Sequence, residues 1–136
     1  MPAVSRWMIR LSLIYFIAGI LAGAFLLIHK AYPLHPTAWL LLPLHIEVTI
    51  FGWIIQYTLG TAYWMLPRYL KGKPRGSRLM SWVMVLCLNL GIVFIIIDPL
   101  EWVSIPLRFT GRVLEVIAVL LFIILHWNRI VTYRNR

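Results

Sequence analysis

Four long runs of apolar residues, separated by short polar stretches, dominate the pattern along this chain. The runs cover residues 7–28, 37–66, 79–97 and 105–127. Each run gives about 30 Å of helix or more, which is the thickness of the hydrocarbon core of a bilayer. Prolines and glycines fall in the connecting stretches, and Pro43 is expected to break the second run near its start. The pattern predicts an all-α, polytopic membrane protein built as a four-transmembrane-helix bundle.

The composition agrees with this fold class and excludes several others. Hydrophobic residues make up 62% of the 136 residues and charged residues only 12%, whereas soluble domains carry about 25% charged residues. The four spans leave no stretch for a soluble domain, so we expect residues 1–136 to form a single membrane domain. The single cysteine, Cys87, cannot form an intrachain disulfide or a CxxC metal site. The first run lacks the features of a cleaved signal peptide, so we expect it to remain as a helix.

The chain has a net charge of +9, and the positions of its basic residues indicate the membrane topology. Basic clusters precede the first span, fill the loop after the second and follow the fourth: Arg6 and Arg10; Arg68, Lys71, Lys73, Arg75 and Arg78; Arg129, Arg134 and Arg136. With four spans all three clusters lie on one side, so the positive-inside rule predicts that both termini are cytoplasmic. We therefore expect a multi-pass protein of the cell (inner) membrane that contacts the lipid bilayer and binds no nucleic acid.

Ionisable side chains inside the spans are the first candidates for function, because a charge there costs about 2.5–3.5 kcal/mol on insertion scales. His45 and Glu47 lie in the second span, and Arg112 and Glu115 lie in the fourth. Helix rise places both sets about 10–14 Å from the outer ends of their spans, so we expect them at matching depth. Arg112 and Glu115 are three residues apart, which permits an ion pair.

Helical periodicity assigns the polar side chains of the second span to two faces. One narrow stripe contains His45, Thr49, Gly52, Gln56 and Tyr63. Glu47 is predicted to point away from this stripe, toward Ile54, Thr58 and Thr61. One face would then look into the bundle and the other toward a second subunit. Gly52 and Gly60 leave space on or beside the stripe, where a flat macrocycle could lie with His45 as its axial ligand.

Other positions are expected to serve packing. Gly19 and Gly23 form a small-xxx-small pattern that permits close helix contact, within the bundle or in a dimer. Asn89 is expected to form hydrogen bonds between helices. Arg108 lies near the end of its span and is expected to extend toward the interface.

The stretch from His45 to Arg68 resembles the second helix of the haem-copper oxidase large-subunit superfamily. Its nearest likeness is to the nitric oxide reductase, cbb3-type and NnrS-like branch. The shared pattern consists of His45, Gly52-Trp53, Gly60, Tyr63 and Pro67. In that family the histidine ligates the low-spin haem, so the resemblance implies that His45 ligates a haem b. The rest of the chain resembles the family only in hydropathy, which implies a small stand-alone relative of the N-terminal, haem-holding part.

The same resemblance limits the chemistry that we expect. The family's large subunits have many more helices, and the helices that would bring the other haem and copper ligands have no counterpart in four spans. We therefore expect no oxygen or nitric oxide reduction site and no stand-alone catalysis. Arg112, at the depth of His45, is a plausible partner for a haem propionate.

The sequence does not identify the second axial ligand of the haem. Helix rise places His126 about 20 Å deeper than His45, at the inner interface, and places His29 and His35 about 10 Å too shallow. The haem would be five-coordinate with His45 alone, or take a ligand from another copy in a homodimer, or use a non-histidine ligand or water. Two axial histidines favour electron transfer, whereas an open position favours diatomic gas binding.

Two other functions compete with this haem b prediction. The chain is alternatively a haem-free accessory or assembly subunit of a larger respiratory complex, with the glycine seam and the Arg112–Glu115 pair as packing devices. A third hypothesis is a quinol-reactive site in the outer half of the membrane, with His45 and Glu47 or Glu115 as proton acceptors. Gln56 and Tyr63 complete the set of polar candidates inside the spans. A transporter is disfavoured, since four spans without a repeat leave little room for alternating access.

Overall fold

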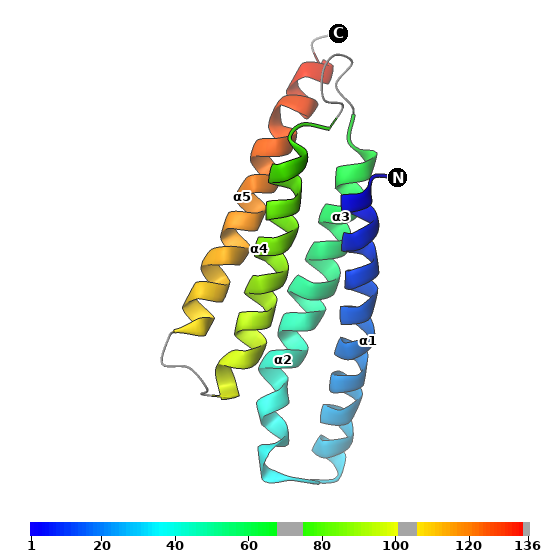
Figure 1. Cartoon of the computed structure of the whole chain (residues 1–136). Coiled ribbons are helices and arrows are strands. Elements are labelled where there is room, and N and C mark those ends of the chain that lie inside the picture. Colours follow the sequence, from blue (N-terminus) through cyan, green and yellow to red (C-terminus); the bar gives the residue numbers. More distant parts are fainter. Residues whose placement is uncertain (68–74, 101–105, 135–136) are drawn as a thin grey trace.

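The computed structural model describes residues 1–67, 75–100 and 106–134, and within these ranges every regular element is a helix. The elements are α1 (Ala3–Ala31), η1 (Pro36–Leu40), α2 (Leu41–Glu47), η2 (Val48–Ile55), α3 (Gln56–Met65), α4 (Arg78–Ile97), η3 (Asp98–Leu100) and α5 (Leu107–Arg134). The segments η1, α2, η2 and α3 follow one another without a gap and form one long rod. Figure 1 shows the long rods side by side, with the start of α1 and the end of α5 toward the same end of the bundle.

The predicted four spans are present in this structure. Four helices are long and apolar enough to cross a membrane: Ala3–Ala31, Pro36–Met65, Arg78–Ile97 and Leu107–Trp127. Two predicted spans are shorter than the helices, since α1 extends beyond 7–28 at both ends and α5 continues to Arg134. The predicted start of the fourth span, residue 105, lies outside the described residues. Large apolar side chains such as Leu21 and Leu27 are exposed on the outer faces, as a multi-pass membrane protein requires. The orientation of the termini stays a prediction.

The second span departs from a regular α-helix in two places. A 3-10 segment ends at Leu40, and Pro43 follows in the first turn of α2, where proline is tolerated. The irregularity expected at Pro43 therefore lies just before it, and the rod continues. Further along, Val48–Ile55 is π-helical. Because π-helical hydrogen bonds skip one more residue than α-helical ones, this segment rotates the side chains that follow it relative to those that precede it.

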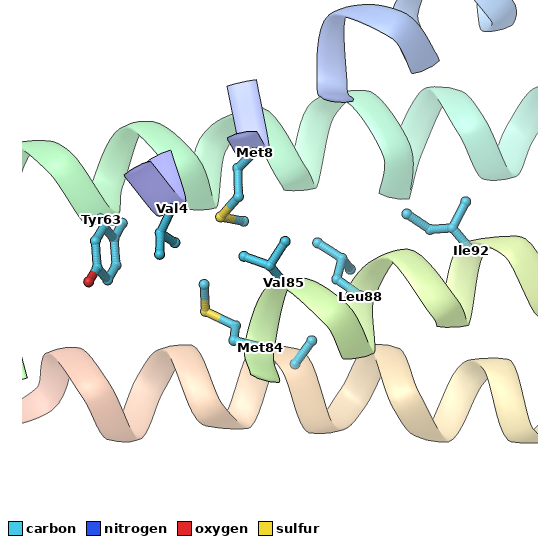
Figure 2. Packing of buried hydrophobic residues seen from close by; sticks show 8 residues of the cluster. Val4, Met8, Tyr63, Met84, Val85, Leu88 and Ile92 are labelled. Atoms are coloured by element: carbon cyan, nitrogen blue, oxygen red, sulfur yellow. The ribbon is translucent and has the colours of Figure 1, made fainter. Parts of the chain in front are cut away.

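The apolar core lies where the four rods meet. It consists of Val4, Met8, Tyr63, Met84, Val85, Leu88, Ile92 and Ala118 (Figure 2). A close backbone contact joins α4 to α5, at Gly91 and Gly111. A Cβ atom on either glycine would lie 2.8 Å from the backbone oxygen of the other. Since backbone cannot move aside as a side chain can, this approach of α4 to α5 requires glycine at both positions.

A second glycine-rich contact joins α1 to the second span. A Cβ atom at Gly19 would lie 2.6 Å from Thr49 Oγ1, and one at Gly23 would lie 2.7 Å from His45 Cε1. The small-xxx-small pattern of α1 is thus a seam inside the bundle. At Gly52 and Gly60 the space is already filled, by Tyr15 and Met8 respectively. The expectation that a macrocycle lies against these two glycines is wrong, because α1 covers that face.

Candidate functional site

His45 projects from α2 toward α1. Its Nδ1 atom lies 2.8 Å from the carbonyl oxygen of Gly19. Because a carbonyl oxygen only accepts, Nδ1 must carry the hydrogen, which leaves the lone pair of the neutral ring on Nε2. Gly23 provides the room for this ring. Histidines that ligate metals are held in the same way, with one ring nitrogen bonded to a carbonyl and the other directed at the metal.

An open groove of about 610 Å³ lies beside His45, between α1 and the second span. Its walls include Ile20, Ala24, Leu27, Leu42 and Trp39, and Lys30 also lines it. The volume falls within the range of about 300–1,000 Å³ that is usual for small-molecule and cofactor sites. The described residues that line the groove include no second histidine, methionine or cysteine. The groove therefore offers one imidazole as a possible metal ligand and one cation, Lys30.

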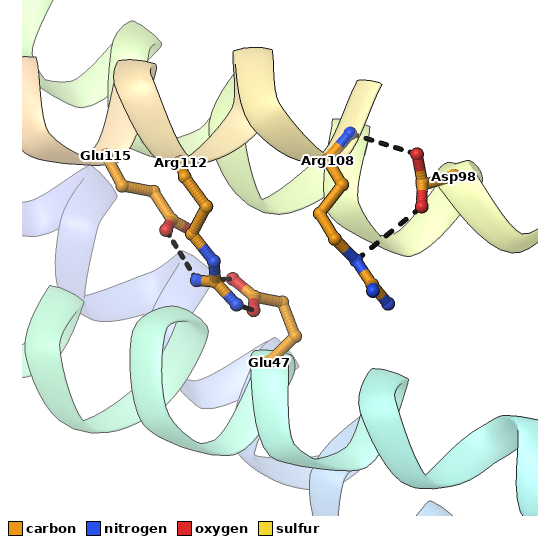
Figure 3. A network of polar contacts seen from close by, with 5 residues as sticks. All are labelled: Glu47, Asp98, Arg108, Arg112 and Glu115. Carbon is orange, nitrogen blue, oxygen red and sulfur yellow. Dashed lines mark hydrogen bonds and ion pairs between the residues drawn. The ribbon is translucent and has the colours of Figure 1, made fainter. Parts of the chain in front are cut away.

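A network of three charged side chains joins α2 to α5 on another face of the second span (Figure 3). Arg112 Nη2 lies 2.8 Å from Glu47 Oε2, and Arg112 Nη1 lies 2.7 Å from Glu115 Oε2. The side chains of Glu47 and Glu115 are 1% and 2% exposed, while that of Arg112 is 45% exposed. The predicted pair of Arg112 with Glu115 is confirmed. Glu47 is a third member that the sequence did not assign to it.

Glu47 points away from the His45 stripe, as predicted, but the prediction that it shares a face with Ile54 and Thr58 is wrong. Glu47 is buried against α5, whereas Ile54 is 49% exposed and Thr58 is exposed as well. The prediction assumed a constant α-helical rotation, but the π-helical segment Val48–Ile55 lies between Glu47 and these residues. The extra rotation places Glu47 and Ile54 on different faces. His45 and Glu47 therefore both contact helices of their own bundle, α1 and α5, and Glu47 does not reach toward a second subunit.

The three-residue network is unbalanced in charge. Two carboxylates share one guanidinium, and Glu115 Oε1 has no hydrogen-bond partner among the described residues. Arg112 also lies over the ring of Phe51, with 4.7 Å between its Cζ atom and the ring centroid. Gly91 makes room for Glu115, since a Cβ atom there would lie 2.8 Å from Glu115 Cγ. The network can tie α2 to α5, and its guanidinium is already bound on two sides.

Nearer the end of the same helix, Arg108 pairs with Asp98 (Figure 3). Asp98 Oδ1 accepts the backbone N–H of Arg108 at 3.0 Å, and Oδ2 lies 3.6 Å from Arg108 Nε. The Arg108 side chain is 60% exposed. This agrees with a side chain that extends toward the interface, and the contact caps the first turn of α5.

The remaining polar candidates pack into the bundle and do not join the groove. Gln56 is fully buried, and its Nε2 donates to the carbonyl oxygen of Met8 at 3.3 Å. Tyr63 is 4% exposed and shares a hydrogen bond of 3.1 Å with Ser81. The predicted stripe thus faces α1 from His45 to Gln56 and then turns toward α4 at Tyr63. His45 and Arg112 are not brought together, because His45 contacts α1 while Arg112 extends from α5 to α2.

Two histidines that were expected at interfaces are buried. His126 is 1% exposed, donates from Nδ1 to the Phe122 carbonyl at 2.7 Å and stacks on the Phe122 ring. His29 is 5% exposed and accepts the backbone N–H of Leu34 at 3.0 Å. His35 lies in the connection before η1, as expected. The position of His126 on the face of α5 that carries Arg112 is the sequence signal that points to its burial.

Two further tertiary contacts complete the polar interior. The Tyr15 hydroxyl donates to Asn89 Oδ1 at 3.2 Å, so the predicted hydrogen bond of Asn89 between helices is confirmed. Arg129, which the sequence identified only as a topological charge, is 2% exposed. It donates to the carbonyl oxygens of Pro67 at 2.7 Å and Leu66 at 2.6 Å, where the second span ends.

No family model, curated protein or solved structure matches this chain. The likeness of the stretch His45 to Arg68 to the haem-copper oxidases therefore stays a prediction from that pattern. A functional proposal rests on the pattern together with the geometry of the His45 groove and of the Arg112 network.

Proposed function

We propose that this chain is a haem b-binding integral membrane protein in which His45 is an axial ligand of the iron. The observation that carries the proposal is the orientation of the imidazole. Its Nδ1 hydrogen is held by the Gly19 carbonyl at 2.8 Å, which makes Nε2 the nitrogen with the available lone pair. An apolar groove of about 610 Å³ lies beside the ring. The His45 to Arg68 pattern independently suggests the same ligand.

Several residues of the chain would together hold the haem. His45 would provide one axial nitrogen, and Gly19 would keep the ring in the required tautomer. Ile20, Ala24 and Leu42 would exclude water from one side of the macrocycle. When bound, haem iron supplies one-electron transfer or the binding of a diatomic gas.

Lys30 is better placed than Arg112 to meet a haem propionate. It lines the same groove as His45, and its position near the end of α1 suits the acidic edge of a haem directed toward the interface. Arg112 extends from α5 and is already bound by Glu47 and Glu115. We therefore assign the propionate contact expected of Arg112 to Lys30.

The second axial position decides between the two haem functions. The described residues lining the groove offer no second ligand, but the groove is open toward the outside of the bundle. A second copy of the chain across this opening would complete a six-coordinate, electron-transfer haem in a homodimer. A vacant position would instead give a five-coordinate haem that binds a diatomic gas.

A reduced-minus-oxidised optical spectrum of the purified protein tests the proposal. We expect haem b bands in the wild type, their loss in His45→Ala, and their retention in the control variant His35→Ala. His35 suits as control because it lies in an exposed connection and its ring bonds to Thr37 nearby. Far-ultraviolet circular dichroism would check that each variant keeps its helices. A featureless wild-type spectrum after expression in haem-replete cells, or bands that persist in His45→Ala, would contradict the proposal.

One observation favours the haem-free accessory subunit as second candidate. The Glu47–Arg112–Glu115 network accounts for the charges buried in the α2–α5 contact without any cofactor. This candidate predicts no Soret absorbance and co-purification with a larger respiratory complex. The quinol-reactive site gains no such support, because His45 and the two carboxylates face different helices.

A further inference from the structure

A second pocket, of about 460 Å³, opens at the end of the bundle where α1 and α4 begin. Its lining includes Ala3 and Val4 of α1, Tyr63 of α3, Arg75 of the connection before α4, and Arg78 and Trp82 in the first turns of α4. It is separate from the His45 groove, and no residue lines both. Neither the haem proposal nor the Arg112 network uses it.

The backbone at this pocket carries partial positive charge. The first N–H groups of a helix have no partner within the helix, and the helix dipole adds positive potential at the same end. Two helices, α1 and α4, begin at this pocket. No side chain caps the start of α1, whereas the Ser77 hydroxyl caps that of α4, and neither first turn contains an acidic residue. Such a site favours an anion.

The side chains reinforce the same preference. Two guanidinium groups, those of Arg75 and Arg78, line the pocket. The Nε atom of Arg75 is buried and has no hydrogen-bond partner among the described residues. Asp98 follows the C-terminal end of α4, about 30 Å from this pocket by helix rise. Glu47 and Glu115 are bound to Arg112, so no described carboxylate balances this pocket.

We propose that this pocket binds a phosphate-bearing anion, held by Arg75, Arg78 and the first-turn amides of α1. Guanidinium groups bind phosphate oxygens through paired, charge-assisted hydrogen bonds. The pocket also has an apolar wall, formed by Val4 and Trp82, that would suit the glycerol and upper acyl carbons of a phospholipid. An anionic phospholipid headgroup and a free phosphate share the chemistry that the pocket recognises, and the test below separates them.

The test is native mass spectrometry of the purified full chain, titrated with phosphatidylglycerol or with phosphatidylcholine. We expect one phosphatidylglycerol to bind the wild type about tenfold or more tightly than phosphatidylcholine, because both lipids carry a phosphate but the choline ammonium adds a positive charge beside the two guanidinium groups. The variant Arg75→Gln/Arg78→Gln is expected to lose this preference. The matched control, Arg6→Gln/Arg10→Gln, removes the same charge from exposed side chains of α1 outside the pocket and is expected to keep it.

A second variant separates binding from folding. Ala3→Asp places a carboxylate in the first turn of α1, where it is compatible with the helix dipole and competes with an incoming anion. We expect it to lower phosphatidylglycerol binding while the thermal stability of the lipid-free protein is kept. The proposal would be overturned if the wild type bound both lipids equally well. It would also be overturned if the Arg6→Gln/Arg10→Gln control lost phosphatidylglycerol binding as much as the pocket variant does.

A competition with inorganic phosphate distinguishes a phospholipid headgroup from a free phosphate. If millimolar phosphate displaces the lipid from the wild type but not from the pocket variant, a free phosphate shares the site and the lipid is one of two occupants. If phosphate has no effect while phosphatidylglycerol binding depends on Arg75 and Arg78, the ligand is the phospholipid and not free phosphate. If neither probe depends on these arginines, the pocket is not an anion site.

Discussion

Replacing Arg112 by methionine should destabilise the bundle strongly. The substitution keeps most of the side-chain length but removes the only cation that contacts Glu47 and Glu115 in the described part of the chain. The carboxyl groups of Glu47 and Glu115, whose side chains are 1% and 2% exposed, would then be buried without a cationic partner. Removing one partner from a buried ion pair costs about 3–5 kcal/mol because the other charge stays buried.

The structure allows this magnitude to be refined. Arg112 is 45% exposed, so part of its interaction is weaker than in a fully buried pair. We expect Arg112→Met to lower the free energy of unfolding by about 2–4 kcal/mol. Glu115→Gln should cost less than Glu47→Gln, since it leaves the α2–α5 contact in place and removes an excess negative charge. The triple variant with Glu47→Gln, Arg112→Met and Glu115→Gln should recover about 1 kcal/mol or more relative to Arg112→Met.

Reversible unfolding in mixed micelles, at increasing mole fraction of a denaturing detergent, measures these differences through tryptophan fluorescence and circular dichroism. Arg108→Met is the matched control, because Arg108 lies one turn away in a pair that is 60% and 28% exposed. We expect the control to cost less than about 1 kcal/mol. The reasoning is refuted if Arg112→Met unfolds as the wild type does, or if the triple variant is less stable than Arg112→Met alone.

Three further outcomes are expected. Gly91→Ala should lower stability by about 1–3 kcal/mol in the same unfolding assay, because its Cβ would meet the Gly111 carbonyl oxygen at 2.8 Å; wild-type stability would contradict the close α4–α5 approach. Asn89→Leu should cost about 0.6 kcal/mol, and no more than about 1.7, through loss of the Tyr15 hydrogen bond. Gly23→Val should displace the His45 ring and weaken the haem bands in the optical spectrum, with helical content unchanged; intact bands would argue against His45.

Much of the architecture could be predicted because it depends on local properties of the chain. The length of an apolar run decides whether a helix can cross a bilayer, so four spans follow from the sequence with errors only at their ends. The contact between Arg112 and Glu115 is equally local, since residues three apart on a helix are neighbours. The interhelical role of Asn89 follows from the cost of leaving an amide unsatisfied in an apolar layer.

The partners of the polar side chains depend on rotations and contacts that no local pattern contains. The π-helical segment Val48–Ile55 rotates the residues that follow it off the face of Glu47, and a constant period cannot anticipate this. Tertiary packing alone decides that Tyr15 and Met8 fill the space beside Gly52 and Gly60. The sequence by itself thus determined how many helices there are and which residues carry the charge. Only the tertiary structure decided that His45 bonds to α1 while Glu47 bonds to α5, because both choices depend on how the helices are rotated against each other.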